Sequence, residues 1–109
     1  MNIGIDIEEV ERFDKYVKND AYLKRIFSKD EIKYCQKKAK PAQNLAARFA
    51  AKEAVWKALN DNKLIISDIS VKNAKDGRPE VYVKDKKQNK IKVSLSHTKQ
   101  YAAAVAVVV

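Results

Sequence analysis

The stretch Ala42–Leu59, with the sequence AQNLAARFAAKEAVWKAL, decides the fold of this chain of 109 residues. At about 100° per residue, its large apolar side chains fall on one side of a helix, and alanines fill much of the other side. A helix that is apolar nearly all round is buried on most sides, and small alanines let neighbouring elements approach closely. We therefore expect a long buried central helix, with Pro41 just before it in the first turn.

Four charged residues interrupt this helix: Arg48, Lys52, Glu53 and Lys57. Glu53 and Lys57 have the i, i+4 spacing of an exposed ion pair, which stabilises a helix by about 0.2–0.5 kcal/mol. The helix offers little exposed surface, however, so a charge on it should be paired, bind a metal or meet a charged ligand. The pattern alone leaves the surface pair and the functional site equally open.

The segments on either side of the central helix predict an α+β fold. N-terminal to it, residues 2–5 read as a strand, residues 7–17 and 21–27 have a helical face, and Ser28 with Glu31 forms a capping box that opens another helix. C-terminal to it, the apolar period changes to two, with strands expected at residues 64–71, 81–83, 91–95 and 101–109 and an Asp76-Gly77 turn. We expect one domain, residues 1–109, with N-terminal helices and a long buried central helix packed on an antiparallel β-sheet.

Composition narrows the function classes. Lys plus Arg number 23 against 14 Asp plus Glu, so the net charge is +9, which favours a phosphate-rich or acidic partner. The only cysteine is Cys35, and no apolar run could span a bilayer, so we expect a cytoplasmic protein with no membrane role. A basic nucleic-acid-binding module remains the alternative, although no nucleic-acid motif supports it and we expect no nucleic-acid partner.

The ionisable residues favour a hard cation over zinc. One His and one Cys are too few for a zinc site, whereas Mg²⁺ needs only one or two carboxylates with waters and phosphate oxygens. Asp6, after the first strand, and Glu53, inside the buried helix, are the acids least explicable as solvated surface. A helix N-cap is the competing interpretation of Asp6. His97 and its polar neighbours either donate hydrogen bonds to a phosphate or form an ordinary polar turn.

Four segments, taken in order, resemble the small bacterial branch of the 4′-phosphopantetheinyl transferases, the holo-[acyl-carrier-protein] synthase family. They are Gly4–Ile7, Arg48–Leu59, Asp76–Pro79 and Leu95–Thr98. The resemblance implies a 4′-phosphopantetheinyl transferase-like fold and an Mg²⁺-dependent enzyme of fatty acid biosynthesis. Such an enzyme moves the 4′-phosphopantetheine group of coenzyme A onto a serine of apo-acyl carrier protein and releases adenosine 3′,5′-bisphosphate. It also implies a homotrimer with active sites at the subunit interfaces.

The resemblance assigns roles to individual residues. Asp6 and Glu53 would be the metal ligands and, with Lys57, the catalytic set. The residues carried over as coenzyme A contacts are Arg48, Lys52, Lys57, Arg78, Pro79, Ser96, His97 and Thr98, the last five from a neighbouring subunit. The residues carried over as the carrier-protein docking surface are Arg12, Lys24 and Arg25. The serine of the carrier is the nucleophile, and either Glu53 or a metal-bound water would accept its proton.

The chain departs from the family after the central helix. The family usually has a Gly-rich turn near the coenzyme, whereas this chain has Asn60–Lys63 with no glycine. Asparagine tolerates the left-handed backbone better than most residues, so we expect the turn to form. We carry no coenzyme contact over to it.

Overall fold

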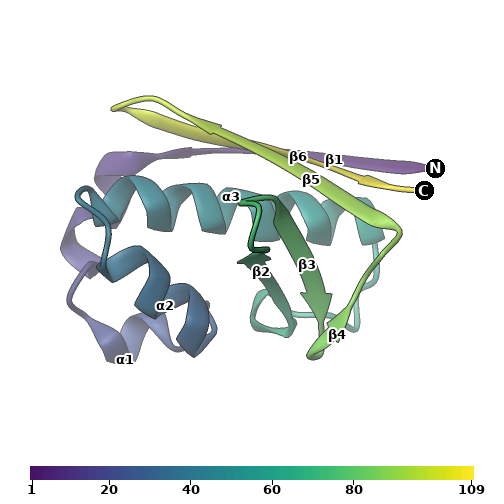
Figure 1. Ribbon diagram of the computed structural model, residues 1–109, viewed down its shortest axis with the longest axis horizontal. Coiled ribbons are helices and arrows are strands. Elements are labelled where there is room, and N and C mark those ends of the chain that lie inside the picture. Colours follow the sequence, from purple (N-terminus) through teal and green to yellow (C-terminus); the bar gives the residue numbers. More distant parts are fainter.

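Helix α3 is the centre of the architecture, which the computed structural model describes for all residues 1–109. A three-stranded sheet covers one side of α3, and short N-terminal helices and a second small sheet lie on the other side (Figure 1). The elements in chain order are β1 (Asn2–Glu9), η1 (Val10–Tyr16), α1 (Asp20–Leu23), α2 (Lys29–Gln36), α3 (Pro41–Leu59), η2 (Ile66–Asp68), β2 (Ile69–Asn73), β3 (Pro79–Val83), β4 (Lys86–Lys87), β5 (Ile91–His97) and β6 (Tyr101–Val108).

The predicted α+β class is confirmed, and the strands divide into two antiparallel sheets of order β1-β6-β5 and β2-β3-β4. The expectation of one sheet C-terminal to the helices was wrong in this detail. Strand β1 pairs with β6 along its full length, from Asn2 opposite Val108 to Glu9 opposite Tyr101. This pairing joins the two ends of the chain, which lie side by side across α3 (Figure 1).

The contact of β1 with α3 is unusually close and depends on a glycine. A Cβ atom added at Gly4 would lie 2.0 Å from the carbonyl oxygen of Ala54 and 2.8 Å from the amide nitrogen of Ala58. Both alanines are buried, and Ala106, the partner of Gly4 in β6, is buried as well. The small residues predicted to admit close neighbours therefore do so here, where backbone meets backbone.

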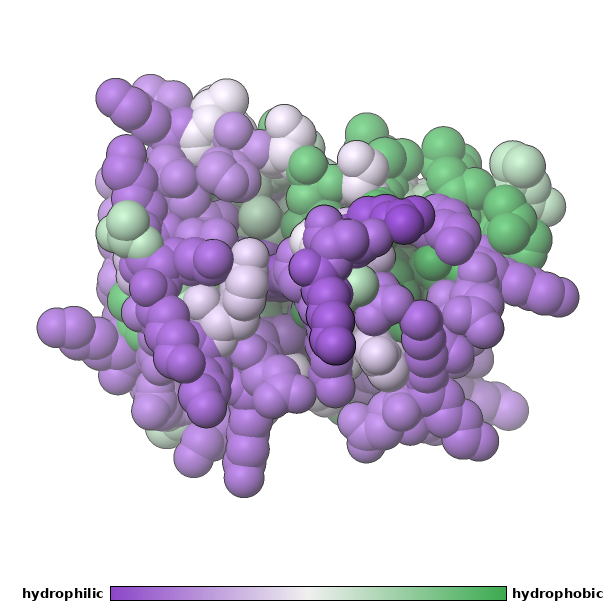
Figure 2. Space-filling model, in the orientation of Figure 1, coloured by the Kyte–Doolittle hydropathy of each residue, from purple (hydrophilic) through white to green (hydrophobic).

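The outer face of the β1-β6-β5 sheet carries apolar side chains that the chain itself does not cover. Ile3, Ile5 and Ile7 are 70%, 68% and 64% exposed, and Ile3 and Ile5 lie opposite Val107 and Val105. Figure 2 shows hydrophobic surface gathered at the end of the molecule where β1 and β6 emerge, in contrast to the hydrophilic surface elsewhere in this view. Exposed apolar surface of this kind marks a contact with another molecule.

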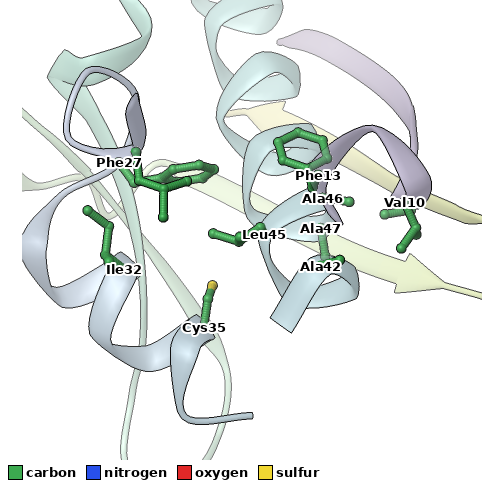
Figure 3. Packing of buried hydrophobic residues seen from close by; sticks show 11 residues of the cluster. Val10, Phe13, Phe27, Ile32, Cys35, Ala42, Leu45, Ala46 and Ala47 are labelled. Atoms are coloured by element: carbon green, nitrogen blue, oxygen red, sulfur yellow. The ribbon is translucent and has the colours of Figure 1, made fainter. Parts of the chain in front are cut away.

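Two apolar clusters lie along α3. One joins its N-terminal half to η1 and α2, and Figure 3 shows Phe27 and Cys35 pointing toward Leu45 while Phe13 packs on another side of the helix. The other lies under both sheets and includes Val55. Burial raises the pKa of the Cys35 thiol to about 12, so this cysteine is a core residue and not a nucleophile.

The C-terminal end of the first strand and the start of the second differ from the predictions. Strand β1 continues to Glu9, because pairing with β6 overrides the helical pattern expected from Ile7, and a 3₁₀ helix begins only at Val10. Asp6 is therefore inside a strand and is not a helix N-cap. Strand β2 begins at Ile69, because the preceding residues form η2 and the carbonyl oxygen of Leu64 accepts the Trp56 indole N–H at 2.8 Å.

The predicted helix boundaries are confirmed where local chemistry sets them. Ser28 and Glu31 form the reciprocal capping box of α2, and Pro41 is the first residue of α3. Asn60 ends α3 in the left-handed conformation, with φ 51° and ψ 41°, as expected for a turn without glycine. None of the helices combines the length and the apolar character that a membrane crossing requires.

Gly4→Ala should destabilise the protein by about 3 kcal/mol, because the added methyl group would collide with the backbone of α3. Urea unfolding monitored by the fluorescence of Trp56, the only tryptophan, measures the loss. Gly77→Ala is the matched control: its Cβ would meet no atom within 4 Å, and the positive φ of 89° should cost only about 1 kcal/mol. Equal losses at the two positions would contradict the close-contact explanation.

Candidate active site

Asp6 and Glu53 are brought together by the close contact of β1 with α3. Asp6 lies two residues after Gly4 and faces the helix, where its Oδ1 accepts a hydrogen bond from Lys57 Nζ at 3.1 Å. The same ammonium donates to the carbonyl oxygen of Ile5 at 3.0 Å. The Asp6 side chain is only 11% exposed, and its Oδ2 atom is buried with no hydrogen-bond partner. An unpartnered carboxylate oxygen in such a position requires a proton or a cation.

Glu8 joins these residues, although no sequence motif marks it. It lies two positions after Asp6 on the same face of β1, and its Oε1 accepts a hydrogen bond from Arg12 at 2.6 Å. Burial and the neighbouring charge of Asp6 raise the pKa of Glu8 to about 8, and the charge of Arg12 opposes the shift. The period-two alternation would have revealed Glu8 if the strand had been predicted to extend beyond Ile5.

Glu53 belongs to the same electrostatic cluster. Burial raises its pKa and the charge of Asp6 raises it further, while Lys57 and Arg12 oppose the shift. The charge of Glu53 also contributes to the raised pKa of Glu8. Asp6, Glu8 and Glu53, which we call the acidic cluster, therefore repel one another in their ionised forms, and a cation among them would relieve that repulsion.

The acidic cluster does not by itself form a complete metal site. No three His, Cys, Asp or Glu side chains are close enough to hold a metal ion together. Magnesium commonly takes one or two carboxylates and completes its coordination with water and substrate phosphate oxygens. The donor set of hard oxygens and the buried, unpartnered Asp6 Oδ2 fit such an ion.

A second feature is a cavity of about 470 Å³ lined by α2, α3, the β2–β3 turn and β5. Four residues expected at the coenzyme line it together: Arg48, Arg78, Pro79 and His97. We call this space the basic cavity. Arg48 is held rigidly within the fold, because it donates to the carbonyl oxygen of Val71 at 3.2 Å and to Asn73 Oδ1. Its guanidinium also lies 4.6 Å from the centre of the Tyr34 ring.

Other expected coenzyme contacts are placed elsewhere. Lys52 has no exposed side-chain surface, and its ammonium binds Glu31 and the carbonyl oxygen of Ile26, so its expected contact with a coenzyme was wrong. Ser96 is exposed but does not line the basic cavity. Thr98 organises the β5–β6 turn, where its Oγ1 accepts the backbone N–H of Tyr101 at 3.0 Å.

The acidic cluster and the basic cavity lie on different sides of α3. At about 100° per residue, Glu53 lies about 140° and Lys57 about 180° around the helix from Arg48. The residues that line the basic cavity include neither of these two nor Asp6. One chain therefore carries two half-sites that point in different directions.

The expected docking residues Arg12, Lys24 and Arg25 are all exposed. Arg12 contacts the rest of the fold through its charge, because it pairs with Glu8 and its guanidinium lies 5.5 Å from the centre of the Phe49 ring. This arrangement places one exposed guanidinium directly beside the acidic cluster.

Comparison with known proteins gives consistent matches over nearly the whole chain. A profile of the 4′-phosphopantetheinyl transferase superfamily matches residues 2–106. The holo-[acyl-carrier-protein] synthase of Thermodesulfovibrio yellowstonii is 43% identical over 109 residues, covering 97% of this chain and 96% of that protein. The one from Chloroherpeton thalassium is 38% identical over 119 residues, covering 99% and 97%. The crystal structure of Helicobacter pylori holo-[acyl-carrier-protein] synthase in complex with coenzyme A superposes with a TM-score of 0.80 and 30% identity, covering 98% of this chain and 99% of that one.

The acidic cluster predicts a pH dependence of stability in metal-free protein. The folded state holds the Glu8 proton up to a pH of about 8, whereas the unfolded chain releases it near 4.5, so the free energy of unfolding should fall across this range as the pH rises. Urea unfolding in EDTA at a series of pH values measures the slope. Glu8→Gln should flatten it, and Glu9→Gln, at the exposed neighbouring position, should not. Parallel slopes for wild type and Glu8→Gln would contradict the assignment.

Proposed function

The chain belongs to the 4′-phosphopantetheinyl transferase superfamily, and we propose that its two half-sites carry out the holo-[acyl-carrier-protein] synthase reaction. The protein transfers the 4′-phosphopantetheine group of coenzyme A to a serine of apo-acyl carrier protein, giving holo-acyl carrier protein and adenosine 3′,5′-bisphosphate for fatty acid biosynthesis. The observation that carries the proposal is the acidic cluster beside Lys57, because transfer from a diphosphate requires charge neutralisation and positioning more than a protein nucleophile.

The acidic cluster is proposed as the magnesium site, with Asp6 and Glu53 as the ligands and Glu8, which is paired with Arg12, outside the ligand set. When bound there, Mg²⁺ would neutralise the charge of the coenzyme diphosphate and of the leaving group. Lys57 supports the same role from the protein side, because its ammonium is held beside Asp6 and its side chain is still 48% exposed, so an incoming phosphate can reach it. The carrier serine supplies the nucleophile, which agrees with the burial of the only thiol, Cys35.

The basic cavity is proposed to bind the adenosine bisphosphate part of coenzyme A. Arg48 and Arg78 supply positive charge, His97 supplies a further polar group, and Pro79 offers an apolar surface to the base. Arg48 suits this task because its contacts with Val71 and Asn73 fix the guanidinium before any ligand arrives. A fixed guanidinium loses little conformational entropy on binding.

We further propose a homotrimer in which the acidic cluster of one subunit meets the basic cavity of its neighbour. The two half-sites of a single chain point in different directions, so an interface between copies is the arrangement that unites them. The exposed apolar face formed by Ile3, Ile5, Ile7, Val105 and Val107 supplies a surface for this association. Its burial between subunits would remove a large apolar area from water.

Arg12, Lys24 and Arg25 are proposed as the docking surface for the acidic carrier protein. All three are exposed, and the net charge of +9 adds a long-range attraction for an acidic partner. Docking by exposed charges weakens as salt is added. We place the reaction in the cytoplasm, which agrees with a chain that has a single, unpaired cysteine.

Asp6→Ala and Glu53→Ala should each lower the rate of carrier modification by about 10²–10³-fold, because each removes charge that holds the metal. Mass spectrometry of apo-carrier protein incubated with coenzyme A and Mg²⁺ measures the transfer. Added Mg²⁺ should also raise the midpoint of thermal unfolding of wild type and not of these variants. Lys87→Met, an exposed position remote from both half-sites, is the control. Unchanged turnover in the two alanine variants would refute the metal assignment.

The homotrimer predicts that light scattering at micromolar protein concentration gives three times the mass of the chain. Ile5→Lys combined with Val105→Lys should yield a folded monomer, because lysines opposite each other on the outer sheet face oppose burial of that face. The monomer should lose affinity for coenzyme A, since each site would then lack one half. A monomeric wild type, or full affinity in a monomeric variant, would contradict the shared site.

A further inference from the structure

Glu31 is the meeting point of three parts of the chain, although the sequence marks it only as a helix-capping residue. Its Oε1 accepts hydrogen bonds from the backbone N–H of Ser28 at 2.8 Å and from Lys52 Nζ at 2.9 Å. Its Oε2 accepts the backbone N–H of Val71 at 2.9 Å. Both side chains of the Glu31–Lys52 ion pair are 0% exposed, so this carboxylate links α2, α3 and β2 in the absence of competing water.

The bond to Val71 occupies the free edge of a sheet. Strand β2 is the outer strand of the β2-β3-β4 sheet, so one row of its backbone groups has no strand to pair with. Glu31 accepts the N–H of Val71, and Arg48 donates to the carbonyl oxygen of the same residue at 3.2 Å. Side chains from α2 and α3 thus take the place of a neighbouring strand at this position.

The turn of the β2–β3 hairpin connects β2 to the basic cavity. The Ala74 N–H donates to the carbonyl oxygen of Arg78 at 2.8 Å, and Asn73 Nδ2 donates to the carbonyl oxygen of Gly77 at 3.0 Å. These bonds make the turn a compact unit that ends in Arg78 and Pro79, both lining the basic cavity. A shift of β2 relative to α3 would therefore move Arg78 relative to Arg48.

We propose that Glu31 and Lys52 are positioning residues, whose buried ion pair fixes the β2–β3 hairpin, and with it Arg78 and Pro79, in the geometry that binds coenzyme A. This inference rests on the proposed function for its ligand and deepens it, since neither residue touches the coenzyme. An ion pair suits the task better than apolar packing, because a charged carboxylate with three donors has one bonding geometry and apolar contacts can slide. Lys52 directly precedes Glu53 in α3, so one helical turn supports both half-sites.

The variants must separate positioning from stability. Lys52→Met or Glu31→Gln alone leaves a buried charge without its partner and is expected to weaken folding. The double variant Glu31→Gln/Lys52→Met removes both charges while keeping the side-chain shapes, so it leaves no unpaired buried charge and should lose less stability than either single variant. It still lacks the charge-assisted bonds that hold β2. Lys87→Met, which removes an exposed ion pair with Glu80 from the same sheet, is the matched control.

Two measurements on the double variant test the proposal. Hydrogen exchange of the amides in residues 69–83 should become faster than in wild type, with no change in α3. In the transfer assay, the KM for coenzyme A should rise about tenfold with kcat nearly unchanged, because the reacting groups on β1 and α3 are untouched. Lys87→Met should alter neither quantity.

Either of two results would overturn the proposal. One is an unchanged KM and unchanged hairpin exchange in the folded double variant. The other is equal acceleration of exchange in α3 and in the hairpin, which would make the pair a general stabilising contact. A wild-type protein that neither binds coenzyme A nor modifies the carrier would instead overturn the proposed function, and hydrogen exchange would then test by itself whether the Glu31–Lys52 pair fixes the hairpin.

Discussion

The contact between Gly4 and the backbone of α3 is the constraint on which the rest of the structure depends. A side chain at this position would meet the carbonyl oxygen of Ala54 at 2.0 Å, so β1 can cross the helix at this depth only with glycine. Because strand residues alternate, the same crossing turns Asp6 toward α3, where Lys57 reaches it at 3.1 Å. The close packing at Gly4 thus places Asp6 beside Lys57, so the position of the acidic cluster follows from a steric requirement of the fold.

Helix α3 must satisfy two opposite demands along its length. Its alanines allow close packing on nearly every side, yet it carries Arg48, Lys52, Glu53 and Lys57. Two of these charges are bonded inside the protein, with Lys52 on Glu31 and Arg48 on β2, and Arg48 also lines the basic cavity. Glu53 belongs to the acidic cluster and Lys57 lies beside it, and burial and the charge of Asp6 raise the pKa of Glu53. Lys52, through Glu31, and Arg48 hold the β2-β3-β4 sheet against the helix, whereas Lys57 stays partly exposed beside Asp6.

Local signals in the sequence predict the elements whose ends are set by local chemistry. The capping box at Ser28 and the left-handed Asn60 place the ends of two helices correctly, because each depends on residues within one turn. The end of β1 and the role of Glu8 escape such reasoning, because pairing with β6 connects residues about 90 positions apart. Lys52 shows the same limit: a charge in an apolar helix indicates a partner, but not that the partner is Glu31, which is supplied by another helix.

The size of the chain connects these observations to the proposed assembly. The 109 residues form one layer on each side of α3, the β1-β6-β5 sheet on one side and short helices with a small sheet on the other. The outer face of the β1-β6-β5 sheet is left with Ile3, Ile5 and Ile7 uncovered. Closing that face with identical subunits, as proposed, would bury the apolar side chains and let a neighbour supply the half-site that each chain lacks.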